Sequence, residues 1–206
     1  LGQLLAAAYI KTNAVRLSPR QLPEIYEFTR EAAGRLGLET PDVYVIQHNV
    51  WNAFAVKLAG RRLVVLFSGA VDSLLARGEA KELRFLIGHE LGHHAAGHLD
   101  RKHTWAACGA WCIWIYLWYS RRRELTCDRI GLYCAGSLHT AMTAMTNLTV
   151  GAQLTPHVSV DAAVAQWEEH QREFFVRYRV MYSSYPPLLC RLAALRDAAT
   201  SLGIPD

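Results

Sequence analysis

The chain has 206 residues, 51% of them hydrophobic and 19% charged, with a formal net charge of +4. This composition suits one globular domain over residues 1–206 with a sizeable core, and it excludes a disordered or fibrous chain. A mild charge without a long basic run excludes an obvious nucleic-acid partner. The five cysteines have no CxxC spacing, so no disulfide framework is expected.

The first third of the chain predicts one helix and three short strands. Residues 23–36 place apolar side chains at helical spacing and begin with proline. β-Branched and alternating residues predict strands at 42–47, 52–58 and 63–69, the last two joined by a turn that contains glycine. These elements indicate an α+β fold, mainly helical, in which a small antiparallel sheet packs on a helical body.

The rest of the chain predicts helices, with breaks at turn residues. They are expected at 79–99, 104–134, 138–149, 159–182 and 187–202. Pro186 and Pro187 separate the last two helices, because proline cannot continue a helix.

The segment Trp105–Tyr119 carries no charged residue and is rich in aromatic side chains. As a helix it is about 22 Å long, which is shorter than the roughly 30 Å hydrocarbon core of a bilayer. Its tryptophans and tyrosines suit contact with a membrane surface. A plain apolar helix is the favoured alternative. The chain begins at Leu1 and not at a methionine, so we expect it to be part of a longer protein. Its first residues show no signal-peptide pattern.

His89, Glu90 and His93 form the pattern H-E-x-x-H inside the predicted helix 79–99. A spacing of four residues puts both imidazoles on one helix face, where they can share a metal ion. Glu90 points beside that face, which suits a base that acts on a metal-bound water. His94 and His98 form a competing pair on a rotated face, and we interpret them as surface or second-layer histidines.

A catalytic zinc ion usually takes three protein ligands and keeps one position open. The extended pattern H-E-x-x-H-x-x-G-x-x-H is excluded, because Ala96 and Leu99 stand at its glycine and third histidine. The third ligand must then be a carboxylate further along the chain. The candidates are Glu124, Asp128, Glu168, Glu169 and Glu173.

Glu124 and Asp128 are the favoured pair, since they lie four residues apart on one face of a predicted helix. Glu124 would bind the metal, and Asp128 would accept the free N–H of a ligand histidine, as partners behind metal ligands commonly do. The three later glutamates fit the water-facing side of an amphipathic helix.

Four segments of the sequence resemble a known family. "EAKELRFLIGHELGHHAAGH" followed by "SRRRELTCDRIG" is similar to the motifs of HtpX-like zinc metallopeptidases, which include the CAAX prenyl endopeptidases. "WNAFAVKLAGRRLVVLFSGAVDSL" upstream and "SSYPPLLCRLAAL" downstream also resemble that family, in the same order. The similarity runs from about residue 23 to residue 195.

The resemblance implies a zincin-like fold and a zinc endopeptidase with one Zn²⁺ per chain. It implies His89, His93 and Glu124 as ligands and Glu90 as general base. It also implies that one strand pairs with an extended polypeptide substrate, which would suit cleavage of unfolded or misassembled proteins. The residues of that strand are Asn52, Ala53, Phe54 and Ala55. A zinc-stabilised scaffold without activity is the alternative, although an intact Glu90 argues against it.

The sequence departs from the family pattern near its end and beside the second motif. Tyr185 stands where the family has a histidine, and its hydroxyl either donates to a developing oxyanion or serves packing. Arg191 matches a family arginine and either pairs with a carboxylate near the site or lies on the surface. Cys127 replaces a small alanine. Because HtpX-like proteins carry membrane spans, we expect the full-length protein to be membrane-associated, with a soluble catalytic domain in the cytoplasm.

Overall fold

The structure is a computed structural model that describes residues 2–50, 52–58, 60–76, 80–100 and 113–205. The strands in this part of the chain are β1 (Val15–Arg16), β2 (Asp42–Ile46), β3 (Ala53–Leu58) and β4 (Arg61–Phe67). The helices are α1 (Gly2–Asn13), α2 (Pro23–Arg35), α3 (Ser68–Leu75), α4 (Lys81–Ala95), α6 (Ile113–Ala135), α7 (Leu138–Val150), α8 (Val160–His170), α9 (Phe174–Met181) and α10 (Leu188–Leu202), with a short 3₁₀ turn at Thr155–His157.

The sheet has the strand order β1-β2-β4-β3. β4 pairs in parallel with β2 and antiparallel with β3, while β1 pairs antiparallel with β2. The expected sheet of three antiparallel strands is therefore corrected to a mixed sheet of four. The reason lies in β4, whose residues Leu63–Leu66 are all buried, so this strand takes the centre and β3 is left at the edge.

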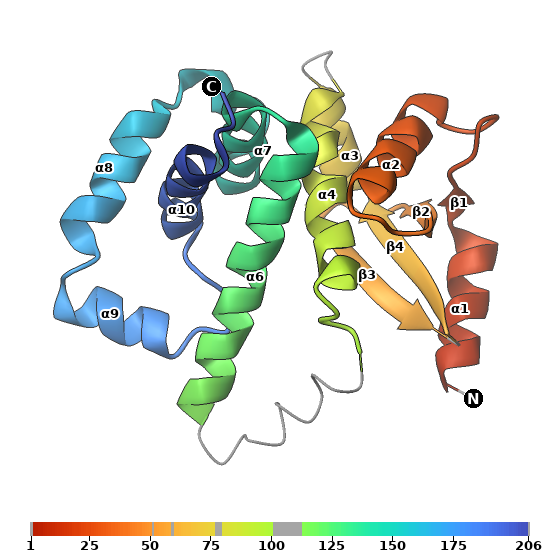
Figure 1. Ribbon diagram of the computed structural model, residues 1–206, viewed down its shortest axis with the longest axis horizontal. Helices are drawn as coiled ribbons and strands as arrows, with labels where there is room; N and C mark the ends of the chain where they lie inside the picture. Colours follow the sequence, from red (N-terminus) through yellow and green to blue (C-terminus); the bar gives the residue numbers. More distant parts are fainter. Residues whose placement is uncertain (1, 51, 59, 77–79, 101–112, 206) are drawn as a thin grey trace.

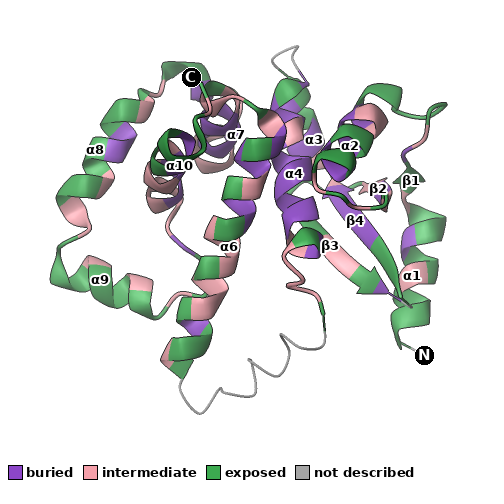
Figure 2. Ribbon diagram, viewed as in Figure 1, coloured by how far each residue is buried: buried purple, intermediate pink, exposed green. Residues whose placement is uncertain are grey.

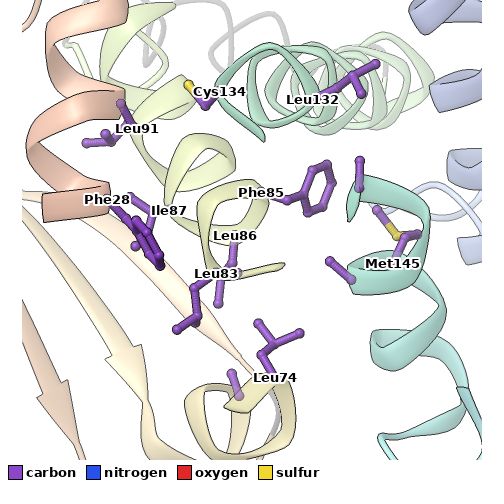
Figure 3. Close-up of a cluster of buried hydrophobic side chains, with 14 of the residues drawn as sticks. Phe28, Leu74, Leu83, Phe85, Leu86, Ile87, Leu91, Leu132, Cys134 and Met145 are labelled. Atoms are coloured by element: carbon purple, nitrogen blue, oxygen red, sulfur yellow. The ribbon is translucent and has the colours of Figure 1, made fainter. Parts of the chain in front are cut away.

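Helix α4 lies between the sheet and the helices α6, α7 and α10 (Figure 1). Figure 2 shows it as the most continuously buried helix of the view. In Figure 3, Leu83 and Ile87 lie on its side toward the sheet and Phe28 of α2, whereas Phe85 points toward Met145 of α7. Because α4 presents apolar side chains both to the sheet and to α7, it is buried on opposite sides. The predicted metal motif therefore sits on the central element of the core.

Two glycines let α4 and α6 pack closely against each other. A Cβ atom on Gly88 would lie 2.6 Å from the Cβ of Cys134, and one on Gly131 would lie 2.8 Å from the carbonyl oxygen of Phe85. Side chains at these positions would push the two helices apart. The close approach matters for function because α6 carries Glu124 and Asp128.

The other helices agree with the sequence in kind and differ in extent. The predicted helix 159–182 is divided into α8 and α9, and Pro187 precedes α10 as expected. Of the predicted helix 104–134, the described part begins at Ile113. The helices α1 and α3 were not predicted. Among the described residues, no helix combines the length and apolar character that crossing a bilayer requires.

Candidate metal centre

The structure brings His89, His93 and Glu124 together between α4 and α6. One ligand atom from each of the three side chains lies within 4.8 Å of the others. The Nε2 atom of His89 is 3.5 Å from Oε2 of Glu124, and Nε2 of His93 is 3.7 Å from Oε1 of Glu124. The close contact of the two helices thus brings His89 and His93 of α4 and Glu124 of α6 into a single cluster.

This cluster fits a tetrahedral zinc ion. With bond lengths of about 2.0–2.1 Å to nitrogen and oxygen, the ligand atoms of such an ion are separated by about 3.3–3.4 Å. The two observed N···O distances, which run to different oxygens of Glu124, exceed that spacing by about 0.1–0.4 Å. Two imidazoles and one carboxylate also form a donor set of the kind that catalytic zinc takes.

Behind the cluster, Asp128 holds His89 in a fixed orientation. The Nδ1 atom of His89 lies 2.9 Å from Oδ1 of Asp128, which leaves Nε2 directed toward Glu124. Burial disfavours a charge on His89, but the hydrogen bonds with Asp128 and Glu124 outweigh it and raise its pKa to about 9. Without a metal, the imidazole therefore carries a proton at the place where the ion would bind.

Arg191 anchors Asp128 from the opposite helix. Its Nε and Nη2 atoms donate hydrogen bonds of 2.8 and 2.6 Å to the two carboxylate oxygens, and both residues are buried. Burial opposes ionisation of Asp128, while the charge and hydrogen bonds of Arg191 lower its pKa below the usual range. Of the two readings of Arg191, the structure shows the one that pairs it with a carboxylate.

The other two candidate ligands, His93 and Glu124, are neutral and ionised, respectively. Burial and the nearby His89 lower the pKa of His93 to about 3, so His93 is neutral. For Glu124, burial acts against ionisation, but hydrogen bonding and charge from His89 prevail and lower its pKa to about 2. A neutral imidazole and an ionised carboxylate are the forms that bind a metal ion.

Glu90 lies beside the cluster and faces the edge of the sheet. Its carboxylate is buried and accepts a hydrogen bond from the backbone N–H of Ala55 in β3. Burial raises the pKa of Glu90 to about 7, against the opposing charge of His89. A carboxyl group with such a pKa can take up and release a proton near neutral pH.

The predicted substrate strand lies at the edge of the sheet. Within the described residues, β3 pairs with β4 alone. Phe67 donates its N–H to the carbonyl of Asn52. In an antiparallel pair, the backbone N–H and C=O groups of successive residues point alternately toward the partner strand and away from it. Those of Asn52 and Phe54 therefore face β4, and those of Ala53 and Ala55 face the open side. That open side is the one at which Glu90 meets the strand.

Tyr185 stands over the other side of the cluster. Its hydroxyl forms a hydrogen bond with Glu124, and its ring lies 5.1 Å from the guanidinium carbon of Arg191. Burial of the hydroxyl and the nearby Glu124 raise its pKa above the usual range, against the charge of Arg191. The hydroxyl is therefore a hydrogen-bond donor at neutral pH.

A cavity of about 300 Å³ opens next to His89 and Glu90. Most of its walls are apolar, and they come from β3, α4, α7 and α10. The lining residues are Asn52, Ala53, Phe85, Leu86, His89, Glu90, Ala144, Met145, Leu148, Tyr185, Leu188 and Arg191. The residues of α7 in this wall were not singled out from the sequence, because an apolar helix gives no sign of facing a cavity rather than the core.

The rejected ligand candidates lie elsewhere. Glu168 forms an ion pair with Arg196 at the surface, and Glu173 contacts the ring of His170. Glu169 is exposed. His94 is buried, with its Nε2 atom 3.1 Å from the carbonyl oxygen of Leu63, so it joins α4 to the sheet. Much of the aromatic segment Trp105–Tyr119 lies outside the described residues.

Comparison with known proteins agrees with the motifs. Residues 19–108 match the model of peptidase family M48. The chain is similar to the plastoglobule-localized metallopeptidase 48 of Arabidopsis thaliana, at 26% identity over 78% of this chain and 50% of that protein. It is similar to a protease HtpX homolog of Thermococcus kodakarensis, at 25% identity over 93% of this chain and 79% of the relative.

A shorter match has a higher identity. A protease HtpX homolog of Thermodesulfovibrio yellowstonii is 35% identical over 81 residues, which cover 39% of this chain and 28% of that protein. The chain thus spans half the length of the Arabidopsis relative and a larger part of the Thermococcus one.

Proposed function

We propose that this chain, an HtpX-like metallopeptidase of peptidase family M48, is a zinc-dependent endopeptidase. The observation that carries the proposal is the convergence of His89, His93 and Glu124 around one point, with the buried Glu90 beside it. The first three residues would hold the ion. When bound there, zinc supplies Lewis-acid chemistry, which polarises a peptide carbonyl and makes water a better nucleophile at neutral pH.

Glu90 would move the proton in this reaction. It takes a proton from the attacking water and delivers it to the nitrogen of the leaving amine. Its burial supports this role, because a pKa of about 7 lets the group exist in both forms near neutral pH. A scaffold that only needs zinc for stability would not need a buried carboxyl group at this position.

Asp128 and Arg191 would keep the ligand set in order. The Asp128 carboxylate fixes the Nδ1 side of His89, and Arg191 fixes the carboxylate with two hydrogen bonds. Holding a ligand histidine in one tautomer and one orientation favours metal binding. On the other side, the Tyr185 hydroxyl, which bonds to Glu124 in this structure, would donate a hydrogen bond to an oxyanion that develops during attack.

The substrate would bind as an extra strand on the open edge of β3. The outward C=O groups of Ala53 and Ala55 can accept hydrogen bonds from an extended backbone, which gives affinity without dependence on side chains. The N–H of Ala53 donates to Asn52 Oδ1 and that of Ala55 to Glu90, so a substrate would have to displace these partners to use the N–H groups as well. The apolar cavity next to Glu90 can take one apolar substrate side chain. Both features favour unfolded or misassembled proteins, which expose extended backbone and apolar residues.

The test is cleavage of an unfolded model protein by the zinc-loaded chain and by Glu90→Gln. We expect cleavage by the wild type, its loss in Glu90→Gln, and one zinc ion per chain in both. Glu82→Gln is the matched control, because it makes the same change two turns earlier on α4, and it should keep activity. If no variant cuts while all hold zinc, the chain is a zinc-stabilised scaffold instead.

We further propose that one end of α6 and the helix α9 form a surface that contacts membranes. Phe174 and Phe175 are 73% and 78% exposed, and Trp118 on α6 is 52% exposed. Arg121 of α6 donates to the carbonyl of Met181 at the end of α9 at 3.2 Å, and to that of Ser183 just beyond it at 2.6 Å. Arginines beside exposed aromatic rings suit an anionic lipid surface.

Sedimentation with anionic vesicles tests this surface. Binding should fall in the double variant Phe174→Ser/Phe175→Ser and persist in Leu154→Ser, which removes an exposed apolar residue elsewhere on the molecule. Equal binding of all three proteins would show that this surface is not the contact.

A further inference from the structure

A second group of potential metal ligands adjoins the candidate metal centre. It consists of His93, His98 and Cys127, with one ligand atom of each within 4.8 Å of the others. The Nδ1 atom of His98 lies 3.4 Å from Nδ1 of His93 and 3.5 Å from Sγ of Cys127. His93 therefore turns one ring nitrogen toward Glu124 and the other toward His98.

The chain is shaped to bring His98 back to this position. After α4 ends at Ala95, Gly97 adopts φ = +68°, a left-handed conformation that glycine takes without strain. The N–H of His98 then donates to the carbonyl of His93 at 3.0 Å. From α6, Arg123 donates to the carbonyl of His98 at 3.2 Å. Both backbone groups of His98 are thus bonded, and its imidazole lies against His93 and Cys127.

Cys127 reaches the same point from α6. It is fully buried, and its neighbour across the helix contact is Gly92, where an added Cβ atom would lie 3.3 Å from the sulfur. Burial and the nearby Glu124 carboxylate raise the pKa of the thiol above its usual range. Without a cation the sulfur therefore keeps its proton.

The two distances known in this group fit a metal site, and the N···N distance fits a metal site better than a hydrogen bond. Zinc with bonds of about 2.0–2.1 Å to nitrogen and about 2.3 Å to sulfur separates two nitrogens by about 3.3–3.4 Å, and a nitrogen from a sulfur by about 3.5–3.6 Å. The observed distances are 3.4 and 3.5 Å. By contrast, a good hydrogen bond between two nitrogens is usually shorter than about 3.2 Å.

We propose that His93, His98 and Cys127 form a second metal site, selective for thiophilic divalent cations such as cadmium or excess zinc. Thiolate and imidazole are the ligands that such cations prefer. Binding removes the proton from the Cys127 sulfur and releases it to solvent. If His93 already holds an ion through Nε2, its Nδ1 proton must leave as well. An ion in one site should therefore weaken binding at the other, because both sites share the imidazole of His93.

The experiment is a cadmium titration of the whole metal-free chain, followed by thiolate-to-cadmium absorption in the ultraviolet and by elemental analysis. It uses the background Cys108→Ser/Cys112→Ser, so that these two thiols do not contribute. We expect an absorption band from one thiolate and up to two cadmium ions per chain. Cys127→Ala should lose the band and bind one ion. In His98→Gln the thiol stays in place, but the cadmium concentration needed to form the band should rise at least tenfold.

Cys190→Ala is the matched control and should keep the band. The proposal is overturned if the band is absent from the background protein, or if it persists in Cys127→Ala. Because the readout is metal binding, this outcome does not depend on peptide cleavage. If the chain does cleave peptides, excess zinc should inhibit the wild type and not Cys127→Ala. Equal inhibition of both would exclude an effect of the second site on the first.

Discussion

Arg191 and Asp128 form a bidentate ion pair in the core, 63 positions apart in the chain, with hydrogen bonds of 2.8 and 2.6 Å. Their side chains are 3% and 2% exposed. The same carboxylate lies 2.9 Å from Nδ1 of His89. This relationship connects the last helix of the fold to the candidate metal ligands, so it should affect both stability and metal binding.

Replacing Arg191 with methionine should destabilise the fold strongly. The substitution leaves the Asp128 carboxylate buried without its partner, which typically costs about 3–5 kcal/mol. Urea unfolding of the metal-free protein measures the change. Arg196→Met is the control, because its pair with Glu168 is exposed and should contribute at most about 1 kcal/mol. Equal losses in the two variants would contradict the role given to the buried pair.

Asp128→Asn should weaken zinc binding, and it should also lower stability, because it leaves the buried Arg191 guanidinium without its charged partner. The amide has nearly the shape of the carboxylate, but it is neutral and is a poorer acceptor for the N–H of His89. Loss of such a partner typically lowers metal affinity about 10–100-fold. Competition with a chelator of known affinity measures this, with the exposed Asp197→Asn as control. An unchanged affinity would mean that Asp128 serves stability alone.

Zinc uptake at pH 7.5 should release about one proton from His89. The pKa of this imidazole in the metal-free protein is about 9, so it is protonated at that pH, whereas a metal ligand must be neutral. Zinc affinity should therefore rise with pH until about 9 and then level off. Calorimetry in two buffers that differ in ionisation enthalpy counts the protons, and a count of zero would rule out a protonated His89.

The raised pKa of His89 also makes the stability of the metal-free protein depend on pH. Because the folded-state pKa of His89 lies above its unfolded value, the bound proton stabilises the fold fully below about pH 6.5. That contribution is lost as the pH rises through about 9.

Tyr185→Phe tests the residue that stands where the family has a histidine. If the hydroxyl donates to the developing oxyanion, its loss should lower kcat about 10²-fold, with little change in KM or zinc content. The phenyl ring can still lie over Arg191, so packing is preserved. Tyr182→Phe, which alters an exposed tyrosine packed on Trp114, is the control. An unchanged kcat would assign Tyr185 to packing.

Much of the site could be predicted from the sequence, because its parts are local patterns. The spacing of His89 and His93 determines that they share a helix face, and the four-residue spacing of Glu124 and Asp128 does the same on α6. The pattern of Pro186 and Pro187 also determined where the last helix begins. These features depend on the geometry of a single helix, which a short stretch of sequence specifies.

The tertiary structure decided which of these patterns meet. The sequence left Arg191 between a buried pair and a surface position, and the packing of α10 against α6 placed it on Asp128. The pattern of residues predicted a sheet of three antiparallel strands. Because β4 is buried on both faces, it lies instead inside a mixed sheet of four.

Two further features depend on contacts between distant segments. The approach of Cys127 to His98 follows from the glycines between α4 and α6, and the cavity wall follows from the position of α7. Local periodicity determines which side of an element is apolar, but the partner of that side depends on how all the elements pack together. For this reason the sequence by itself determined the candidate ligands and the chemistry of their side chains, and only the fold decided which of them meet and what surrounds them.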